Sequence, residues 1–163
     1  MSEKTLVSAP PSGLLRLVLR LPVLLYRLRL GWLLDGRFIL INHIGRKTGH
    51  LHKTVVEVLG YSKESDTYFI VSGWGYKANW YQNLSAVPNI SIQVGHRKLD
   101  VHAETVSVDE GTQLLVDYRQ KHPFAARELS RLMGLNLFEA SPEKLSQIVQ
   151  NSLPVVALHP RSF

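Results

Sequence analysis

Residues 90–106, ISIQVGHRKLDVHAETV, decide the predicted fold. Apolar and polar residues alternate on both sides of Gly95 and His96, and such alternation is typical of strands with one buried face. Glycine at the first position of a two-residue connection favours a tight hairpin turn. The stretch therefore predicts an antiparallel strand pair over residues 90–94 and 97–106.

Short apolar runs on either side of this hairpin, separated by polar or glycine-containing turns, predict the remaining strands. They cover residues 38–43, 53–61, 68–72 and 153–159. Helices are expected outside the strand run: one after Ser107 in a capping-box pattern, one over 124–133, and one after Ser141 with proline at its first position. Six short antiparallel strands with helices at their periphery indicate a small barrel.

Composition narrows the class of protein. A chain of 163 residues with 45% hydrophobic and 20% charged residues fits one globular domain and argues against disorder. The absence of cysteine excludes disulfides, thiol catalysis and every cysteine-based metal site. The net charge is +6, and residues 1–60 account for all of it, with nine basic and three acidic side chains. This asymmetry indicates an anionic partner: a membrane surface, a phosphate-bearing ligand or nucleic acid.

The N-terminal third divides into a polar arm and a leucine-rich segment. We expect a flexible arm at residues 1–13, an amphipathic helical segment at 14–34, and a single barrel domain at 35–163. Arginines interrupt the leucine-rich segment, which argues against a bilayer span and against a signal peptide. Those at positions 16, 20 and 27 fall within about 40° of one another on a helix. Two interpretations stay open: an interfacial helix on anionic lipid, or a helix packed on the domain with its arginines solvated.

The turn Gly45-Arg46-Lys47-Thr48-Gly49 lies between two predicted strands. Its glycines permit positive φ and leave backbone N–H groups free to point at an anion, while Arg46 and Lys47 add charge. This pattern predicts a phosphate or carboxylate site. The alternative is a polar hairpin with solvated charges.

Residues 79–84, NWYQNL, predict a short helix that Asn79 caps. Trp80 and Asn83 are three residues apart and so share one face, where they would contact a planar ligand or the core. The glycines of residues 73–78 resemble a dinucleotide motif, but the helix and parallel strand that it needs do not follow. His50 and His52 lack a third ligand nearby, so no metal site is expected.

Taken in order, the motifs of this chain resemble the deazaflavin-dependent nitroreductase family. They are residues 43–49, 54–58, 72–75 and 80–84, followed by Asn89 and residues 94–95. The resemblance covers about residues 30–135. It implies an α+β, mainly β fold: a six-stranded antiparallel split β-barrel with peripheral helices, related to the flavin-binding pyridoxamine-phosphate oxidases.

The resemblance also implies the cofactor, coenzyme F-420, an 8-hydroxy-5-deazaflavin with a phosphate and a polyglutamate tail. Arg46 and Lys47 would meet the phosphate or tail, with help from Lys53 and Lys77. Thr54 and Val55 would lie near the ring. The backbone at residues 72–75 would approach the cofactor closely, and Trp80 and Asn83 match the family's W-Y-x-N-L motif at the cofactor site. The complete implied cofactor site is Gly45, Arg46, Lys47, Thr48, Gly49, Lys53, Thr54, Val55, Ser72, Gly73, Gly75, Lys77, Trp80 and Asn83.

Family members transfer a hydride from the reduced deazaflavin to a quinone, a nitroaromatic compound or an activated double bond. On the acceptor side, His122 would donate a proton and Phe124 would form a wall, although the tyrosines that some members place there are absent. Two alternatives stay open: an FMN-binding oxidoreductase of the same barrel, and a non-catalytic F-420 carrier. Nucleic acid is not expected as a partner, because a recognition helix and an RNP motif are both missing. We expect a cytoplasmic protein, and leave open a homodimer and peripheral contact with the inner face of the membrane.

Overall fold

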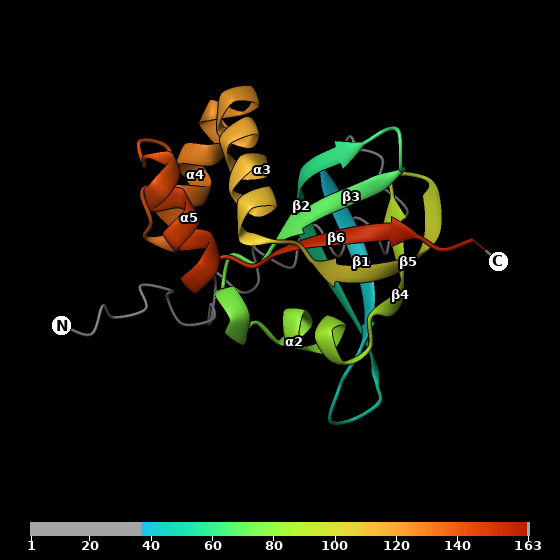
Figure 1. The fold of residues 1–163 in the computed structure, drawn as a ribbon. Coiled ribbons are helices and arrows are strands. Elements are labelled where there is room, and N and C mark those ends of the chain that lie inside the picture. Colours follow the sequence, from blue (N-terminus) through green and yellow to red (C-terminus); the bar gives the residue numbers. More distant parts are fainter. Residues whose placement is uncertain (1–36, 163) are drawn as a thin grey trace.

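A computed structural model describes residues 37–162 of the chain, and the predicted arm and helical segment lie outside this range. Six antiparallel strands form a closed barrel in the order β1-β2-β3-β6-β5-β4, with β4 pairing back onto β1 (Figure 1). The strands are β1 (Phe38–Ile44), β2 (Leu51–Ser62), β3 (Thr67–Val71), β4 (Asn89–Val94), β5 (Arg97–Thr105) and β6 (Val155–Pro160). The predicted fold class is thus confirmed.

The hairpin that decided the prediction is present. Val94 pairs with Arg97 across the turn, and Gly95 has a positive φ of 57°. On β4, Ile90, Ile92 and Val94 are buried, as their alternation with polar residues requires.

Four α-helices and one 3-10 turn accompany the barrel in the described range. They are η2 (Gly75–Lys77), α2 (Asn79–Ala86), α3 (Val108–Lys121), α4 (Pro123–Met133) and α5 (Pro142–Asn151). The hydroxyls of Ser107 and Ser141 accept from the backbone N–H groups of Glu110 and Lys144, so both predicted N-caps are confirmed. No helix in residues 37–162 is long and apolar enough to cross a bilayer.

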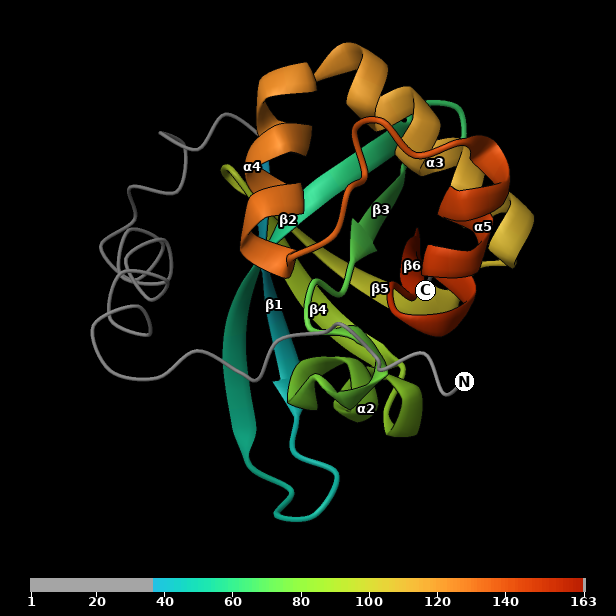
Figure 2. The ribbon, with the colours of Figure 1, turned by 90° about the vertical axis from the view of Figure 1, so that its left-hand side faces the viewer.

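The helices occupy two ends of the barrel. Figures 1 and 2 show α3, α4 and α5 gathered at one end, while α2 lies at the other end beside the β1–β2 turn. The barrel encloses one apolar cluster that includes Ile39, Ile41 and Leu158, and the helices form a second one with Leu59 and Val155. Burying a side chain of this size stabilises the fold by about 1.5–3 kcal/mol.

Strand β2 serves both clusters because successive side chains of a strand point to opposite faces, and its register also shifts between Val58 and Gly60. Such a bulge bends a strand and redirects its side chains. Val58 packs against the barrel cluster, whereas Leu59 is buried in the helical cluster.

Candidate cofactor site

The β1–β2 turn closes on its own backbone. The N–H of Gly45 donates to the carbonyl of His50 (2.8 Å), and that of Gly49 donates to the carbonyl of Gly45 (2.8 Å). A Cβ on Gly45 would lie 2.6 Å from the Thr48 hydroxyl, and Gly49 has a φ of +71°, so both positions require glycine. The expectation that these glycines leave their N–H groups free for an anion is wrong, because the turn itself uses both.

Arg46 fastens this turn to helix α2. Its backbone N–H and its guanidinium NH1 both donate to Oδ1 of Asn83, at 3.1 and 2.9 Å. NH2 also donates to Oδ1 of Asn79 at 3.4 Å. The predicted capping role of Asn79 is therefore wrong: Asn79 is the first residue of α2, Ala78 is the N-cap, and the Asn79 side chain is directed to the arginine.

A buried histidine extends this contact into the barrel. His43 is 3% exposed; its Nδ1 lies 3.0 Å from Nδ2 of Asn83, and its Nε2 lies 3.0 Å from the hydroxyl of Thr54. Burial, and secondly the neighbouring His52 that stacks on the ring at 5.6 Å, lowers the pKa of His43 from 6.5 to about 4. The ring is therefore neutral near pH 7.

His43 was not among the predicted site residues. The sequence does carry a signal for it, because His43 has the same strand parity as Ile39 and Ile41, and both isoleucines face the interior. A histidine on a buried strand face needs polar partners, and Asn83 and Thr54 supply them.

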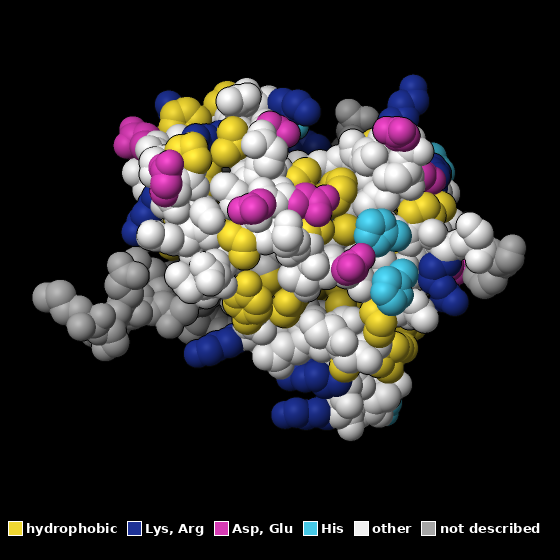
Figure 3. Space-filling view, in the orientation of Figure 1, with side chains coloured by type: hydrophobic (Ala, Val, Ile, Leu, Met, Phe, Trp, Pro, Cys, Tyr) yellow, Lys and Arg dark blue, Asp and Glu magenta, His cyan; other side chains and the backbone are white. Residues whose placement is uncertain are grey.

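The lysines predicted for the phosphate and tail are exposed. Lys47 lies in the turn, Lys53 near the start of β2 and Lys77 at the end of η2, and none of them forms an ion pair with a described residue. Figure 3 shows Lys and Arg side chains at the end of the molecule that carries α2 and the β1–β2 turn. This end can hold an anion without breaking an existing salt bridge.

The remaining predicted cofactor residues have structural contacts of their own. Ser72 is fully buried, and its hydroxyl donates to the carbonyl of Gly75 at 2.7 Å, which shapes the loop before α2. Trp80 belongs to the barrel cluster, and Val55 is half-buried on β2. Contact of these residues and Gly73 with a cofactor stays a prediction.

The comparisons with known proteins identify the family. Residues 25–130 match the family model described as F420H(2)-dependent quinone reductase. The chain belongs to this family. It is therefore an oxidoreductase that depends on coenzyme F-420, which confirms the predicted enzyme class.

Solved structures agree on the fold of this quinone reductase family member. An F420-H2 dependent reductase (FDR-A) is 19% identical with a TM-score of 0.50, covering 76% of this chain and 94% of its own. A protein described as a domain-swapped dimer is also 19% identical with a TM-score of 0.50, covering 85% and 99%. A pyridoxamine 5'-phosphate oxidase-related, FMN-binding protein from Nostoc punctiforme is 16% identical with a TM-score of 0.50, covering 93% and 83%. A search of curated proteins gave no match.

The acceptor-side residues lie away from the turn. His122 separates α3 from α4, with its ring 5.5 Å from that of Tyr118, and Phe124 at the start of α4 is 78% exposed. In both ribbon views this junction and the β1–β2 turn are at opposite ends of the barrel. The structure therefore unites Arg46, Asn83 and Thr54 but does not bring His122 and Phe124 to them.

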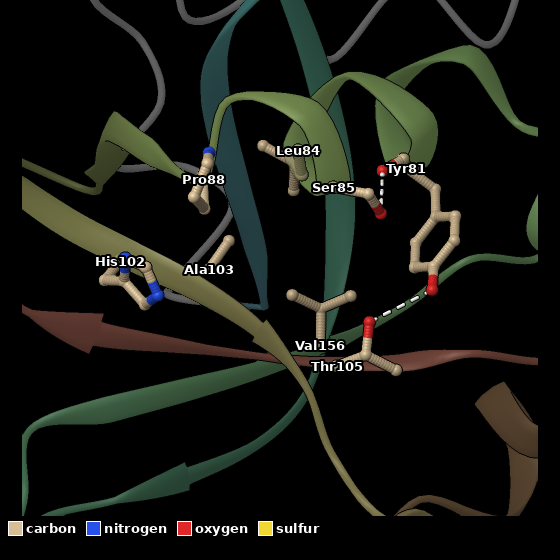
Figure 4. Close-up of a pocket in the computed structure, with 8 residues that line it drawn as sticks. All are labelled: Tyr81, Leu84, Ser85, Pro88, His102, Ala103, Thr105 and Val156. Carbon is tan, nitrogen blue, oxygen red and sulfur yellow. Dashed lines mark hydrogen bonds between the residues drawn. The ribbon is translucent and has the colours of Figure 1, made fainter.

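A separate groove of about 280 Å³ lies between α2 and β5 (Figure 4). The hydroxyls of Tyr81 and Thr105 lie 3.0 Å apart in a hydrogen bond that joins α2 to β5. The Ser85 hydroxyl donates to the Tyr81 carbonyl within α2 itself. On a helical projection, Tyr81 and Ser85 point away from Asn79 and Asn83. The groove thus belongs to the other face of α2 and carries none of the predicted site residues. Among residues 37–162, no cluster of three or more His, Asp or Glu side chains could hold a metal ion.

Proposed function

We propose that this member of the quinone reductase family transfers a hydride from reduced coenzyme F-420 to a quinone. The observation that carries the proposal is the β1–β2 turn, which Arg46 and buried Asn83 fix against α2 while Lys47 remains exposed and unpaired with any described residue. A fixed turn with a free cation suits the phosphate or the anionic tail of the cofactor.

The residues present fit this cofactor chemically. Lys47 and Lys53 would hold the phosphate or the tail, and Thr54 and Val55 on β2 would lie along the ring system. The bound cofactor supplies the hydride. The protein holds and orients it, and the apolar barrel end beside Trp80 excludes water from the reacting atoms.

Titration of the purified protein with F-420 and, separately, with FMN tests the proposal through cofactor fluorescence. We expect saturable binding of F-420 that is tighter than binding of FMN, because FMN has a phosphate but lacks the anionic tail. Addition of a soluble quinone to protein with reduced F-420 should then oxidise the cofactor. Tighter binding of FMN would favour the FMN-dependent alternative, and F-420 binding without turnover on any acceptor would favour a carrier.

The role of His122 and Phe124 belongs to the same proposal. In a single chain they are remote from the turn, so they can meet the reacting end of the cofactor only through an extended acceptor or a second copy of the chain. We propose a homodimer for this reason, and the similar structure described as a domain-swapped dimer supports it.

Substitution Phe124→Ala separates an acceptor wall from a core residue. Because Phe124 is 78% exposed, the change should alter the free energy of unfolding by less than about 0.5 kcal/mol. Turnover with a quinone should fall while the Kd for F-420 stays unchanged. Steady-state kinetics and cofactor titration check this, and equal losses in both quantities would contradict the acceptor role.

We also propose that the protein works in the cytoplasm with residues 14–34 at the inner face of the membrane, near lipid-soluble quinones. The arginines at positions 16, 20 and 27, which a helical projection of the sequence places within about 40° of one another, support the proposal, since each basic residue near an anionic surface contributes about 1 kcal/mol. The full chain should co-sediment with anionic liposomes at low salt, less at high salt, and not with neutral liposomes. No sedimentation with anionic liposomes at low salt would contradict it.

A further inference from the structure

A chain of hydrogen bonds runs from Arg46 through Asn83 and His43 to Thr54. Each bond in this chain has a defined donor and acceptor. Both Arg46 groups that reach Asn83 are donors, at 3.1 and 2.9 Å from the same oxygen. Oδ1 must therefore be the atom that faces Arg46, since a flipped amide would set its NH2 group against two donors. The Asn83 NH2 group then faces His43, and it can only donate.

This direction determines the tautomer of His43. Nδ1 accepts from Asn83 at 3.0 Å, so it carries no proton, and the neutral ring has its proton on Nε2. Nε2 is 3.0 Å from Oγ1 of Thr54 and therefore donates to it. The low pKa of His43, about 4, agrees with a ring that keeps one proton.

Thr54 is the end of this chain of bonds. Its oxygen accepts from His43, and among the described residues Oγ1 has no other hydrogen-bond partner. The hydroxyl hydrogen is thus unused within residues 37–162. Thr54 is half-buried on β2, one residue beyond Lys53 and 11 residues from His43 in the sequence.

We propose that His43 is a positioning residue, which fixes the Thr54 hydroxyl as a hydrogen-bond donor to an acceptor atom of the bound cofactor. The proposal rests on the proposed function, since it takes the ligand at the turn to be F-420. A ring carbonyl or an anionic ring atom would accept the hydroxyl hydrogen, which His43 leaves available because it occupies a lone pair of the Thr54 oxygen. Arg46 thereby has two roles. It holds the turn, and through Asn83 and His43 it leaves the hydroxyl hydrogen of Thr54 available for donation.

The first test needs no cofactor. Imidazole nitrogen NMR of the full chain, with the His43 signals assigned by their loss in His43→Phe, should show the Nε2–H tautomer at pH 7. In Asn83→Leu the preference for this tautomer should weaken, because the amide that imposes it is gone. An Nδ1–H tautomer or a protonated ring in the wild-type protein would overturn the proposal, whatever ligand the turn binds.

The second test is a double-mutant cycle on F-420 affinity, read by cofactor fluorescence. Thr54→Val and His43→Phe should each weaken binding about five- to tenfold, the size expected for one hydrogen bond. The double variant should be no weaker than either single variant, because His43 acts through Thr54. Thr54→Ser, which keeps the hydroxyl, should retain affinity. Independent, multiplicative losses would overturn the proposal.

His52→Phe is the matched control. His52 stacks on His43 but makes no hydrogen bond in this chain of contacts, so its removal should leave F-420 affinity within about twofold. A loss equal to that of His43→Phe would assign the effect to ring packing and overturn the positioning role. If the wild-type protein fails to bind F-420 at all, the proposed function fails, and the NMR tautomer alone then decides the role of His43.

Discussion

Replacing Arg46 and Lys47 together by alanine is expected to weaken F-420 binding by about 2–4 kcal/mol, or roughly 30- to 1,000-fold in Kd. Charge-assisted hydrogen bonds to a phosphate or carboxylate are the strong ones, and the double variant removes the exposed cation Lys47 together with Arg46, which fixes the turn against α2. Fluorescence titration measures the loss. It should shrink as salt rises, because screening weakens these contacts in the wild-type protein.

The single variants and a charge control make this result specific. Lys47→Ala should leave the melting temperature unchanged. Arg46→Ala should lower it, because Asn83 Oδ1 then keeps only the backbone N–H of residue 46. Lys98→Ala removes an exposed cation from β5 and should not change affinity. An unchanged Kd in the double variant would remove the cofactor role of the turn.

A second large effect is expected on the free energy of unfolding at acidic pH. His43 has a folded pKa of about 4 against 6.5 in an unfolded chain, so between these pH values the unfolded chain binds a proton that the native state does not. The contribution of neutral His43 to the free energy of unfolding should therefore be fully present above pH 6.5 and fall progressively toward pH 4. A shift of this size corresponds to about 3 kcal/mol in the free energy of unfolding. Urea denaturation at several pH values measures it.

The variant His43→Phe isolates this contribution. It should be less stable than wild type at pH 7, since Asn83 and Thr54 lose their partner, but its stability should change less between pH 6.5 and 4. Other acid-sensitive groups, such as Asp66 paired with Arg97, are common to both proteins and cancel in the comparison. Parallel curves for the two proteins over this window would show that His43 titrates normally.

Local pattern was sufficient for most of the barrel. Alternation over residues 90–106 predicted β4 and β5 to within one residue at each end. Strand β2 was predicted to begin at Lys53 but begins at Leu51. Leu51 and His52 are exposed and show no buried face; they belong to the strand because their backbones pair with Ile44 and His43.

The site was harder to predict because its contacts cross long stretches of sequence. Asn83 and His43 are 40 residues apart, and they meet only because α2 docks against the β1–β2 turn. Sequence pattern could mark Asn83 as one face of a short helix, but it could not show which way its amide points. It also could not show that the junction of α3 and α4, which carries His122 and Phe124, lies at the end of the molecule away from the β1–β2 turn.

The closed strand order has a consequence for synthesis on the ribosome. Strand β6 follows the other five strands in the sequence and pairs with both β3 and β5, so its place stays vacant until residues 155–160 have been translated. Until then the nascent protein exposes two strands with unpaired backbone groups, the kind of surface that recruits other chains into aggregates. Removal of β6 would make that state permanent. A stop codon placed before residue 155 should therefore yield insoluble protein rather than a shorter enzyme.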